Sequence, residues 1–190
     1  EKAVQEIGGS GVGVRGDMGK LGDIDHLYDV IQQQHGQIDV LVANAGGGDF
    51  AALGEITEQH YEQTFNTNVK GVLFTVQKAL PLLKDGASIV MTASTTSVKG
   101  TPGFSVYSAT KAAVRNFARS WILDLKPRRI RVNAVSPGLT DTAGLNELFG
   151  GGEQAEGTKS WLSEQVPSGR IGQPSEVANA VPILAADDAS

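Results

Sequence analysis

The sequence contains no cysteine among its 190 residues. This absence excludes disulfides, thiolate zinc sites, iron–sulfur clusters and a cysteine nucleophile together. No apolar run approaches the roughly 18–20 residues of a membrane-spanning helix. The first residues, from Glu1 to Glu6, have neither the basic region nor the apolar region of a signal peptide. We therefore expect a cytoplasmic protein with no membrane partner.

Positive charge is also scarce, because 16 Lys and Arg stand against 21 Asp and Glu, giving a net charge of −5. This balance provides no electrostatic reason to expect nucleic acid as a partner. The three histidines, His26, His35 and His60, lack the spacing of zinc ligands, so we predict no metal site. An apolar fraction of 40 % is typical of a globular chain, and the length predicts one domain, residues 1–190.

Short runs rich in Val, Ile and Ala alternate with helical patterns along the chain. The predicted strands are 12–15, 38–43, 87–93 and 130–135. The predicted helices are one around Ile24 to Ile31 with Gly36 at its C′ position, 57–84 with Thr57 as N-cap, 105–126 ended by Pro127, and one beginning at Pro174. Residues 144–159 are expected to form a mobile loop.

The order of these elements predicts an α/β fold. Alternating strands and helices are typical of a Rossmann-like, doubly wound parallel sheet with helices on both faces. The run from Val40 to Ala43 is apolar without alternation, as expected for a strand covered on both faces. In such folds ligands bind at the carboxyl ends of the strands.

Residues 11–16 match the G-x-G-x-x-G pattern of dinucleotide-binding loops. That match carries meaning only when a strand precedes it and a helix follows directly. Here helix-like residues precede the pattern, and Val12 and Val14 fit a strand. We therefore do not assign these glycines to phosphate binding.

Tyr107 and Lys111 lie four residues apart near the start of a predicted helix, so both side chains share one helix face. A phenol has an ordinary pKa of about 10, and a neighbouring ammonium favours the phenolate. The pair can therefore move a proton on or off an alcohol oxygen. Taken alone it is weak evidence, because such pairs are common on solvated helix faces.

The ends of the predicted strands carry further polar and glycine residues. Asn44-Ala45-Gly46 follows one strand, Ser94 follows the next, and Pro137-Gly138 follows the last. Asn68 lies within the apolar pattern of the long helix, where an amide needs a partner. Core packing alone does not explain this coincidence, so we expect a site at this edge of the sheet.

Together these residues resemble the short-chain dehydrogenase/reductase family, in its single-domain form that includes 3-oxoacyl carrier-protein reductases and sugar or alcohol dehydrogenases. Ser94, thirteen residues before Tyr107, is the most specific part of the match. The matching residues, in the family's order, are Asp17, Asn44-Ala45-Gly46, Asn68, Ser94, Tyr107, Lys111, Pro137-Gly138 and Thr142.

The resemblance implies an NAD(P)-dependent oxidoreductase that acts on a ketone or secondary alcohol. Tyr107 would be the general acid/base, and Ser94 would hold the substrate oxygen. Lys111 would lower the Tyr107 pKa and bind the nicotinamide ribose, and Asn68 would hold a water that relays protons. The implied coenzyme contacts are Asp17 and Met18 at the adenine, Asn44, Ala45 and Gly46 at its ribose, Tyr107 and Lys111, and Pro137, Gly138, Thr140 and Thr142 at the nicotinamide.

Several points stay open at this level. The choice between NAD and NADP is not readable, and the small-molecule substrate ranges from 3-oxoacyl thioesters to sugars and cyclic alcohols, with Arg170 and Lys99 as candidate contacts for an anionic one. The family's first β-α-β unit and its last strand have no counterpart in the sequence, so we expect a piece of a longer polypeptide. The resemblance also predicts a homotetramer, with Phe117, Trp121 and Leu125 as contact residues.

Two alternatives differ in function. One is a catalytically inactive nicotinamide-binding sensor or scaffold, and the other is a nucleotide-sugar epimerase or dehydratase of the extended branch. The presence of all three of Ser94, Tyr107 and Lys111 favours an enzyme, and Asn68 with Pro137-Gly138 favours the reductase branch.

Overall fold

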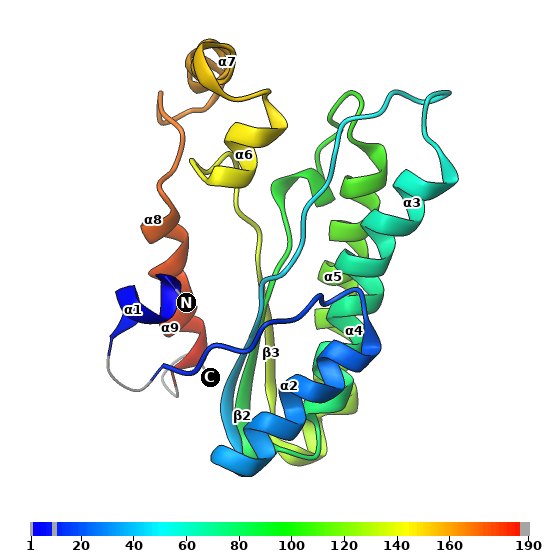
Figure 1. The fold of residues 1–190 in the computed structure, drawn as a ribbon, viewed down its shortest axis with the longest axis vertical. Helices are drawn as coiled ribbons and strands as arrows, with labels where there is room; N and C mark the ends of the chain where they lie inside the picture. The colour runs from blue at the N-terminus through cyan, green and yellow to red at the C-terminus, as the bar shows by residue number, and fades with distance from the viewer. Residues whose placement is uncertain (1, 9–10, 187–190) are drawn as a thin grey trace.

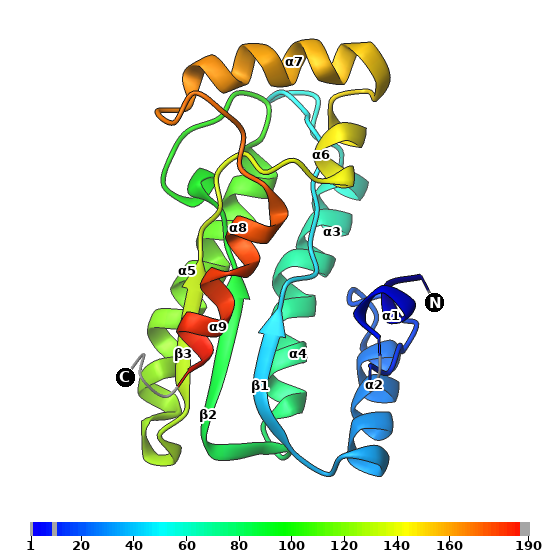
Figure 2. The same cartoon turned by 90° about the vertical axis from the view of Figure 1, so that its left-hand side faces the viewer.

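A parallel sheet of three strands lies between two layers of helices in the computed structural model, which describes residues 2–8 and 11–186 (Figures 1 and 2). The strands are β1 (Ile38–Ala43), β2 (Leu83–Thr92) and β3 (Arg131–Val135), in the order β1-β2-β3. Leu41 lies opposite Ile89, and Ile89 lies opposite Val132. This arrangement confirms the predicted doubly wound α/β class.

One face of the sheet is covered by helices from the first two thirds of the chain, with α2 packed on α4, α4 on β1, and α5 on β2 and β3. On the other face α9 packs on β2 and β3. Val40 and Val42 of β1 are 43 % and 44 % exposed, so the expectation that this strand is covered on both faces is wrong. These helices are α2 (Leu21–Gln34), α3 (Glu58–Phe65), α4 (Val72–Ala79), α5 (Ser105–Asp124), α8 (Pro174–Ala178) and α9 (Ala180–Ala185). The remaining helices are α1 (Lys2–Ile7), α6 (Ala143–Leu148) and α7 (Gly152–Gln165).

The core lies between the sheet and the layer of α2, α4 and α5. Ile89 and Met91 of β2, Ile24 of α2 and Val114 of α5 are all fully buried. Each such side chain contributes about 1.5–3 kcal/mol by leaving water. None of the helices in the described part of the chain is both long and apolar enough to cross a bilayer.

Arg131 ties the helix on the opposite face to the sheet. Its guanidinium donates to the carbonyls of Leu184 (2.7 Å) and Ala185 (2.8 Å), at the C-terminal end of α9. These carbonyls have no partner within the helix, and a cation there is favoured by the helix dipole. The arginine of β3 therefore caps α9 and fixes it against the strands.

The predicted strand at 12–15 does not form. Residues 11–16 are assigned to no strand or helix. Gly11 lies close to the Ile7 side chain, and Gly13 lies close to that of Val4, so this segment packs against α1 rather than beside another strand. The helix α1, and not a strand, lies before residues 11–16, so this segment lacks the context that a dinucleotide fingerprint requires.

The predicted helix over 57–84 is wrong in its length and its continuity. Thr57 caps its start as expected, since its side chain accepts from the His60 N–H at 3.1 Å. The helix then changes to a π-helical turn at Asn66–Gly71 and ends at Ala79. Pro81 follows after the C-cap residue Leu80, and proline is common just after a helix end because it cannot continue one. After Pro81 the chain enters β2 at Leu83, four residues before the predicted start of the strand 87–93.

Residues 144–159 form α6 and most of α7 instead of a loop. Thr142 is the N-cap of α6, because its Oγ1 accepts from the Leu145 N–H at 3.2 Å. The glycines of this segment led to the prediction of a loop. Gly150, Gly151 and Gly152 all have positive φ and make the turn between the two helices. Residues 187–190, where the family pattern ends, lie outside the described residues.

Two smaller differences concern helix ends. The helix predicted over 105–126 ends at Asp124, and Pro127 lies in a short 3₁₀ turn after it. The helix predicted from Pro174 is divided at Asn179 into α8 and α9. The helix of Ile24 to Ile31 is confirmed as α2, and Gly36 follows its end with φ of 74° and donates to the Ile31 carbonyl at 3.0 Å.

Gly71 marks a close approach between the π-helical turn and the chain before α2. A Cβ at this position would lie 2.6 Å from the backbone oxygen of Met18. We expect Gly71→Ala to lower the free energy of unfolding by about 1–3 kcal/mol through overpacking. Urea denaturation measures this change. The control is Gly22→Ala, which meets open space in α2 and should cause no loss; an equal loss in both variants would contradict the close approach.

Candidate active site

The predicted catalytic residues meet beyond the carboxyl ends of β1 and β2. Ser94 follows β2, Tyr107 and Lys111 come from α5, and Asn68 comes from the π-helical turn. Asn68 is fully buried, and Lys111 is 3 % exposed. The helices and loops thus place these side chains at the edge of the sheet where the parallel strands end.

Tyr107 lies in the first turn of α5, with its ring stacked on Phe104 at a centroid distance of 4.4 Å. Its hydroxyl lies beside Ser94. The Ser94 oxygen in turn accepts from the Thr96 hydroxyl at 3.0 Å and the Thr96 N–H at 3.2 Å. These two donors leave the Ser94 hydroxyl proton free to point toward Tyr107 or a substrate oxygen.

Lys111 is held below Tyr107 by one hydrogen bond, from its Nζ to the Thr92 carbonyl at 2.8 Å. The same Nζ lies 5.5 Å from the centre of the Tyr107 ring. Burial lowers the Lys111 pKa from 10.5 to about 8. Burial also raises the pKa of Tyr107, and the neighbouring Ser94 hydroxyl opposes this rise. The expectation that the tyrosine pKa is lowered thus differs from the structure, because removal from water outweighs the favourable contacts.

Asn68 joins three segments through its amide group. Its Oδ1 accepts from the Gly47 N–H at 3.0 Å, and its Nδ2 donates to the Gly47 carbonyl at 2.8 Å. The second Nδ2 proton goes to the Thr110 hydroxyl at 3.0 Å, and Thr110 donates to the Tyr107 carbonyl at 2.6 Å. The side chain therefore clamps the loop after β1 to the start of α5, with both of its N–H groups used.

The glycines after β1 permit close approach to the side chains that are predicted to be catalytic. A Cβ at Gly46 would lie 3.0 Å from Asn68 Oδ1 and 3.2 Å from Lys111 Nζ. A Cβ at Gly48 would lie 2.6 Å from Tyr107 Cδ2. Gly48 is a site residue that sequence reasoning missed. The run of three glycines was its only signal, and a flexible loop explains that run equally well.

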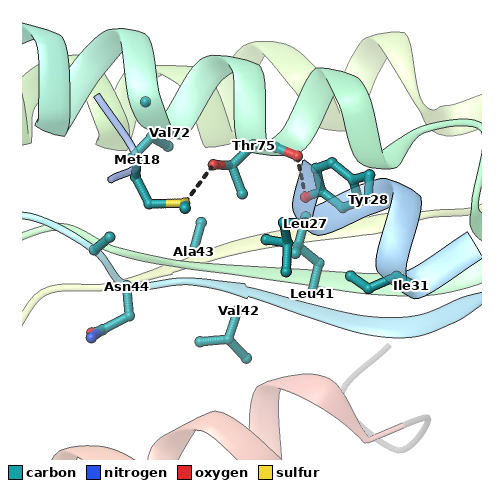
Figure 3. Close-up of a pocket in the computed structure, with 12 residues that line it drawn as sticks. Met18, Leu27, Tyr28, Ile31, Leu41, Val42, Ala43, Asn44, Val72 and Thr75 are labelled. Atoms are coloured by element: carbon teal, nitrogen blue, oxygen red, sulfur yellow. Dashed lines mark hydrogen bonds between the residues drawn. The ribbon is translucent and has the colours of Figure 1, made fainter. Parts of the chain in front are cut away.

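Three of the predicted adenine-side residues lie together in a cavity of about 130 Å³ between α2, β1 and α4 (Figure 3). They are Met18, Asn44 and Ala45. The Asn44 Oδ1 accepts from the Thr92 hydroxyl at 2.8 Å, which ties the ends of β1 and β2 together. Asp17 is exposed and accepts from the Gly19 N–H at 2.9 Å, in the turn that leads into α2.

Tyr28 lines the cavity on its α2 side. Its hydroxyl donates to the Thr75 carbonyl at 2.5 Å, and the Thr75 hydroxyl donates to Met18 Sδ at 3.9 Å (Figure 3). Burial raises the pKa of this phenol. The tyrosine is thus neutral and fixed, so it serves as a wall rather than a reacting group.

The residues predicted near the nicotinamide follow β3. The Pro137 carbonyl accepts from the Thr95 N–H at 3.0 Å, which brings this turn beside the Ser94 loop. Thr140 donates to the Gly138 carbonyl at 3.2 Å, and Thr142 caps α6. Pro137 is therefore tied to the loop of Ser94, and the Thr140 backbone pairs with Gly172, whereas the side-chain hydrogen bonds of Thr140 and Thr142 are local. No three His, Asp or Glu side chains gather as metal ligands would in residues 2–8 and 11–186.

Burial of Lys111 makes stability depend on pH. Below pH 8 the folded protein holds a buried ammonium, and between about pH 8 and 10.5 it has lost a proton that the unfolded chain keeps. The unfolded state then binds more protons, so stability rises with pH. Between pH 7.5 and 9.5 we expect a gain of about 2 kcal/mol in wild type relative to Lys111→Met.

Urea denaturation of both proteins at the two pH values measures this gain. The comparison with Lys111→Met removes the opposite contributions of Tyr28 and Tyr107, whose raised pKa values lower stability only at higher pH as unfolded tyrosines ionise. Parallel pH dependence in the two proteins would show that Lys111 keeps its ordinary pKa.

The chain is similar to known proteins over its whole length. A family profile described as enoyl-(acyl carrier protein) reductase matches residues 1–190. The chain is 39 % identical over 192 residues to an oxidoreductase named asL5 from Sarocladium schorii, with 100 % of this chain and 75 % of the relative covered. It is 34 % identical over 201 residues to a probable tetrahydroxynaphthalene reductase from Zymoseptoria tritici, with 98 % and 74 % covered.

A solved structure has the same fold. It is described as a short-chain dehydrogenase/reductase, glucose/ribitol dehydrogenase, from Brucella melitensis. The TM-score is 0.84 at 31 % sequence identity, and the match covers 92 % of this chain and 69 % of that one.

Proposed function

The chain is an oxidoreductase of the short-chain dehydrogenase/reductase family, and on that premise we propose that it transfers a hydride between a nicotinamide coenzyme and a ketone or secondary alcohol. The observation that carries this proposal is the placement of Tyr107 beside Ser94, with the buried Lys111 Nζ 5.5 Å from the centre of the tyrosine ring. These three residues lie beyond the carboxyl ends of the strands, where α/β folds bind their ligands.

Tyr107 acts as the proton donor in the direction of ketone reduction. Because burial raises its pKa, the phenol keeps its proton at neutral pH and can deliver it to a carbonyl oxygen that gains negative charge. Ser94 donates its hydroxyl proton to that same oxygen and stabilises the developing charge. The reverse reaction needs the phenolate, so we propose that alcohol oxidation accelerates as pH rises.

The residues around Lys111 fit a nicotinamide coenzyme. A protonated lysine has three N–H donors, and among the described residues only the Thr92 carbonyl accepts from this one. Two donors are therefore available for the hydroxyls of a ribose, and Gly46 leaves room beside them. The coenzyme, NAD or NADP, would supply the hydride. On the adenine side we propose Asp17, Met18, Asn44 and Ala45 as its contacts, with Pro137, Gly138, Thr140 and Thr142 beyond β3.

Asn68 is proposed as a positioning residue for this reaction. Its amide holds Gly47 from both sides and reaches the backbone of Tyr107 through Thr110. Since both amide N–H groups are used, a relay water would be left with only the remaining lone pair of Oδ1. The contacts therefore favour fixation of the loop and of α5 as the main contribution of this side chain.

We retain the homotetramer as a proposal with a changed contact surface. Leu125 is 8 % exposed and belongs to the core of this chain, so it is not available to a partner. Ile122 and Leu123, at the end of α5, are exposed apolar residues that suit such a contact better. Light scattering that finds only monomer would exclude it.

Absorbance at 340 nm tests the proposed function. The protein is mixed with NADH or NADPH and a panel of ketones and 3-oxoacyl thioesters, and oxidation of one coenzyme establishes the activity and the coenzyme preference. Binding of coenzyme with no turnover on any compound would favour the sensor. Turnover of a nucleotide sugar without net coenzyme oxidation would favour the epimerase.

A further inference from the structure

A row of four aromatic rings begins at Tyr107. The centroid of Phe104 lies 4.4 Å from that of Tyr107, that of Phe50 lies 4.7 Å from Phe104, and that of Phe149 lies 6.5 Å from Phe50. The rings come from the start of α5, the loop after β1 and the end of α6. Three segments that are distant in sequence thus place aromatic surface beside the proposed acid.

Phe50, the third ring of this row from Tyr107, is held in place although it is exposed. Phe50 is 47 % exposed, whereas Phe104 is 9 % exposed. The Ala51 N–H donates to the Gly103 carbonyl at 2.8 Å, which holds the loop of Phe50 against the turn before α5. A half-exposed ring that is held in place offers a flat apolar face without a further ordering cost, and such faces are typical of ligand sites.

The segment that follows β3 offers little for an anionic substrate. Between residues 136 and 186 the only basic residues of the sequence are Lys159 and Arg170. Lys159 pairs with Asp141 at 3.2 Å and with Glu156 at 2.5 Å. Arg170 pairs with Glu176 through two hydrogen bonds of 2.6 and 2.7 Å. Both cations of this segment are thus already paired with carboxylates, so the segment after β3 is poorly suited to hold the phosphate of a substrate.

We propose that the substrate is a fused-ring aromatic ketone whose rings stack on Phe50 and Phe149 while its carbonyl reaches Tyr107 and Ser94. This inference rests on the proposed function and adds the substrate class. In the reaction the carbonyl double bond is reduced to a single bond, the carbon gains the hydride of the reduced coenzyme, and the oxygen gains the Tyr107 proton. The coenzyme is oxidised, so atoms and electrons balance. The Zymoseptoria tritici relative is named a probable tetrahydroxynaphthalene reductase, and naphthalene has two fused aromatic rings, which agrees with this class.

The test compares two bicyclic ketones of matched size, 2-tetralone with one aromatic ring and 2-decalone with none. An acetoacetyl N-acetylcysteamine thioester represents the acyl class. The variants are Phe50→Leu, which keeps an apolar side chain, and the control Tyr61→Leu, which removes an exposed stacked ring of α3 outside the row. Coenzyme oxidation gives kcat/KM, and calorimetry with 2-tetralone and oxidised coenzyme gives binding without turnover.

We expect wild type to prefer 2-tetralone to the other two compounds. Phe50→Leu should lower kcat/KM for 2-tetralone by about three- to tenfold, leave 2-decalone within about twofold, and weaken the calorimetric affinity for 2-tetralone in parallel. Tyr61→Leu should change neither. Equal use of the two ketones, equal losses in Phe50→Leu, or preference for the thioester would overturn the substrate class while leaving the proposed function intact. If no compound is turned over, the proposed function fails, and absence of 2-tetralone binding would then reject the aromatic site as well.

Discussion

Tyr107→Phe is expected to lower kcat for ketone reduction by about 10²- to 10⁴-fold, the usual contribution of a positioned general acid. The substitution removes only the hydroxyl group. The ring keeps its stack on Phe104, and Lys111 keeps its bond to the Thr92 carbonyl. Coenzyme affinity should therefore change little, and the loss should appear in kcat. Absorbance at 340 nm under saturating coenzyme measures it.

The matched control is Tyr61→Phe. Tyr61 lies on α3 with 48 % of its surface exposed, so loss of its hydroxyl should leave turnover unchanged. Thermal denaturation of the variants shows whether folding is preserved. If folded Tyr107→Phe turned over ketones at the wild-type rate, the proton would come from another group and the assignment to Tyr107 would be wrong.

The sequence predicts the fold class correctly, and the structure brings the predicted site residues together, because both predictions depend on local patterns. The helical period around Ile24 indicates a buried element wherever it lies in space, and Ile24 is fully buried. The apolar run around Leu41 correctly indicates a strand, although only one of its faces is covered. Ser94, Tyr107 and Lys111 are placed by their spacing relative to a strand end and a helix start. The structure brings them together because parallel strands end at one edge of the sheet.

What the sequence does not predict depends on contacts between distant segments. The π-helical turn places the fully buried Asn68 so that its amide bonds to Gly47 and Thr110. The sequence does not predict this turn because both partners are distant from Asn68 along the chain. The strand expected at 12–15 has a suitable pattern, but a strand also requires a neighbour with which to pair. The helix end at Ala79 reflects Pro81, a signal that a longer apolar period masked, and the helix start at Ala143 reflects the Thr142 cap.

Substitution of Asn68 should affect stability and catalysis together. Asn68→Ala leaves the Thr110 hydroxyl without the donor at 3.0 Å, frees both backbone groups of Gly47, and opens a small cavity in a fully buried position. Lost hydrogen bonds and cavity formation together predict a decrease of about 2–4 kcal/mol in the free energy of unfolding. Urea denaturation of the variant and the wild type gives this value.

The catalytic part of the effect follows from the path through Thr110 to the Tyr107 backbone. When the clamp is lost, the first turn of α5 and the loop of Gly47 are no longer fixed against each other, and small misplacements of a catalytic group cost up to about 10²-fold in rate. We therefore expect kcat to fall at temperatures where the variant is still folded. Asn66→Ala provides the control, because Asn66 lies in the same π-helical turn with an exposed side chain and should stay within about 0.5 kcal/mol of wild type. A folded Asn68→Ala enzyme with unchanged kcat would show that this amide serves packing of the turn alone.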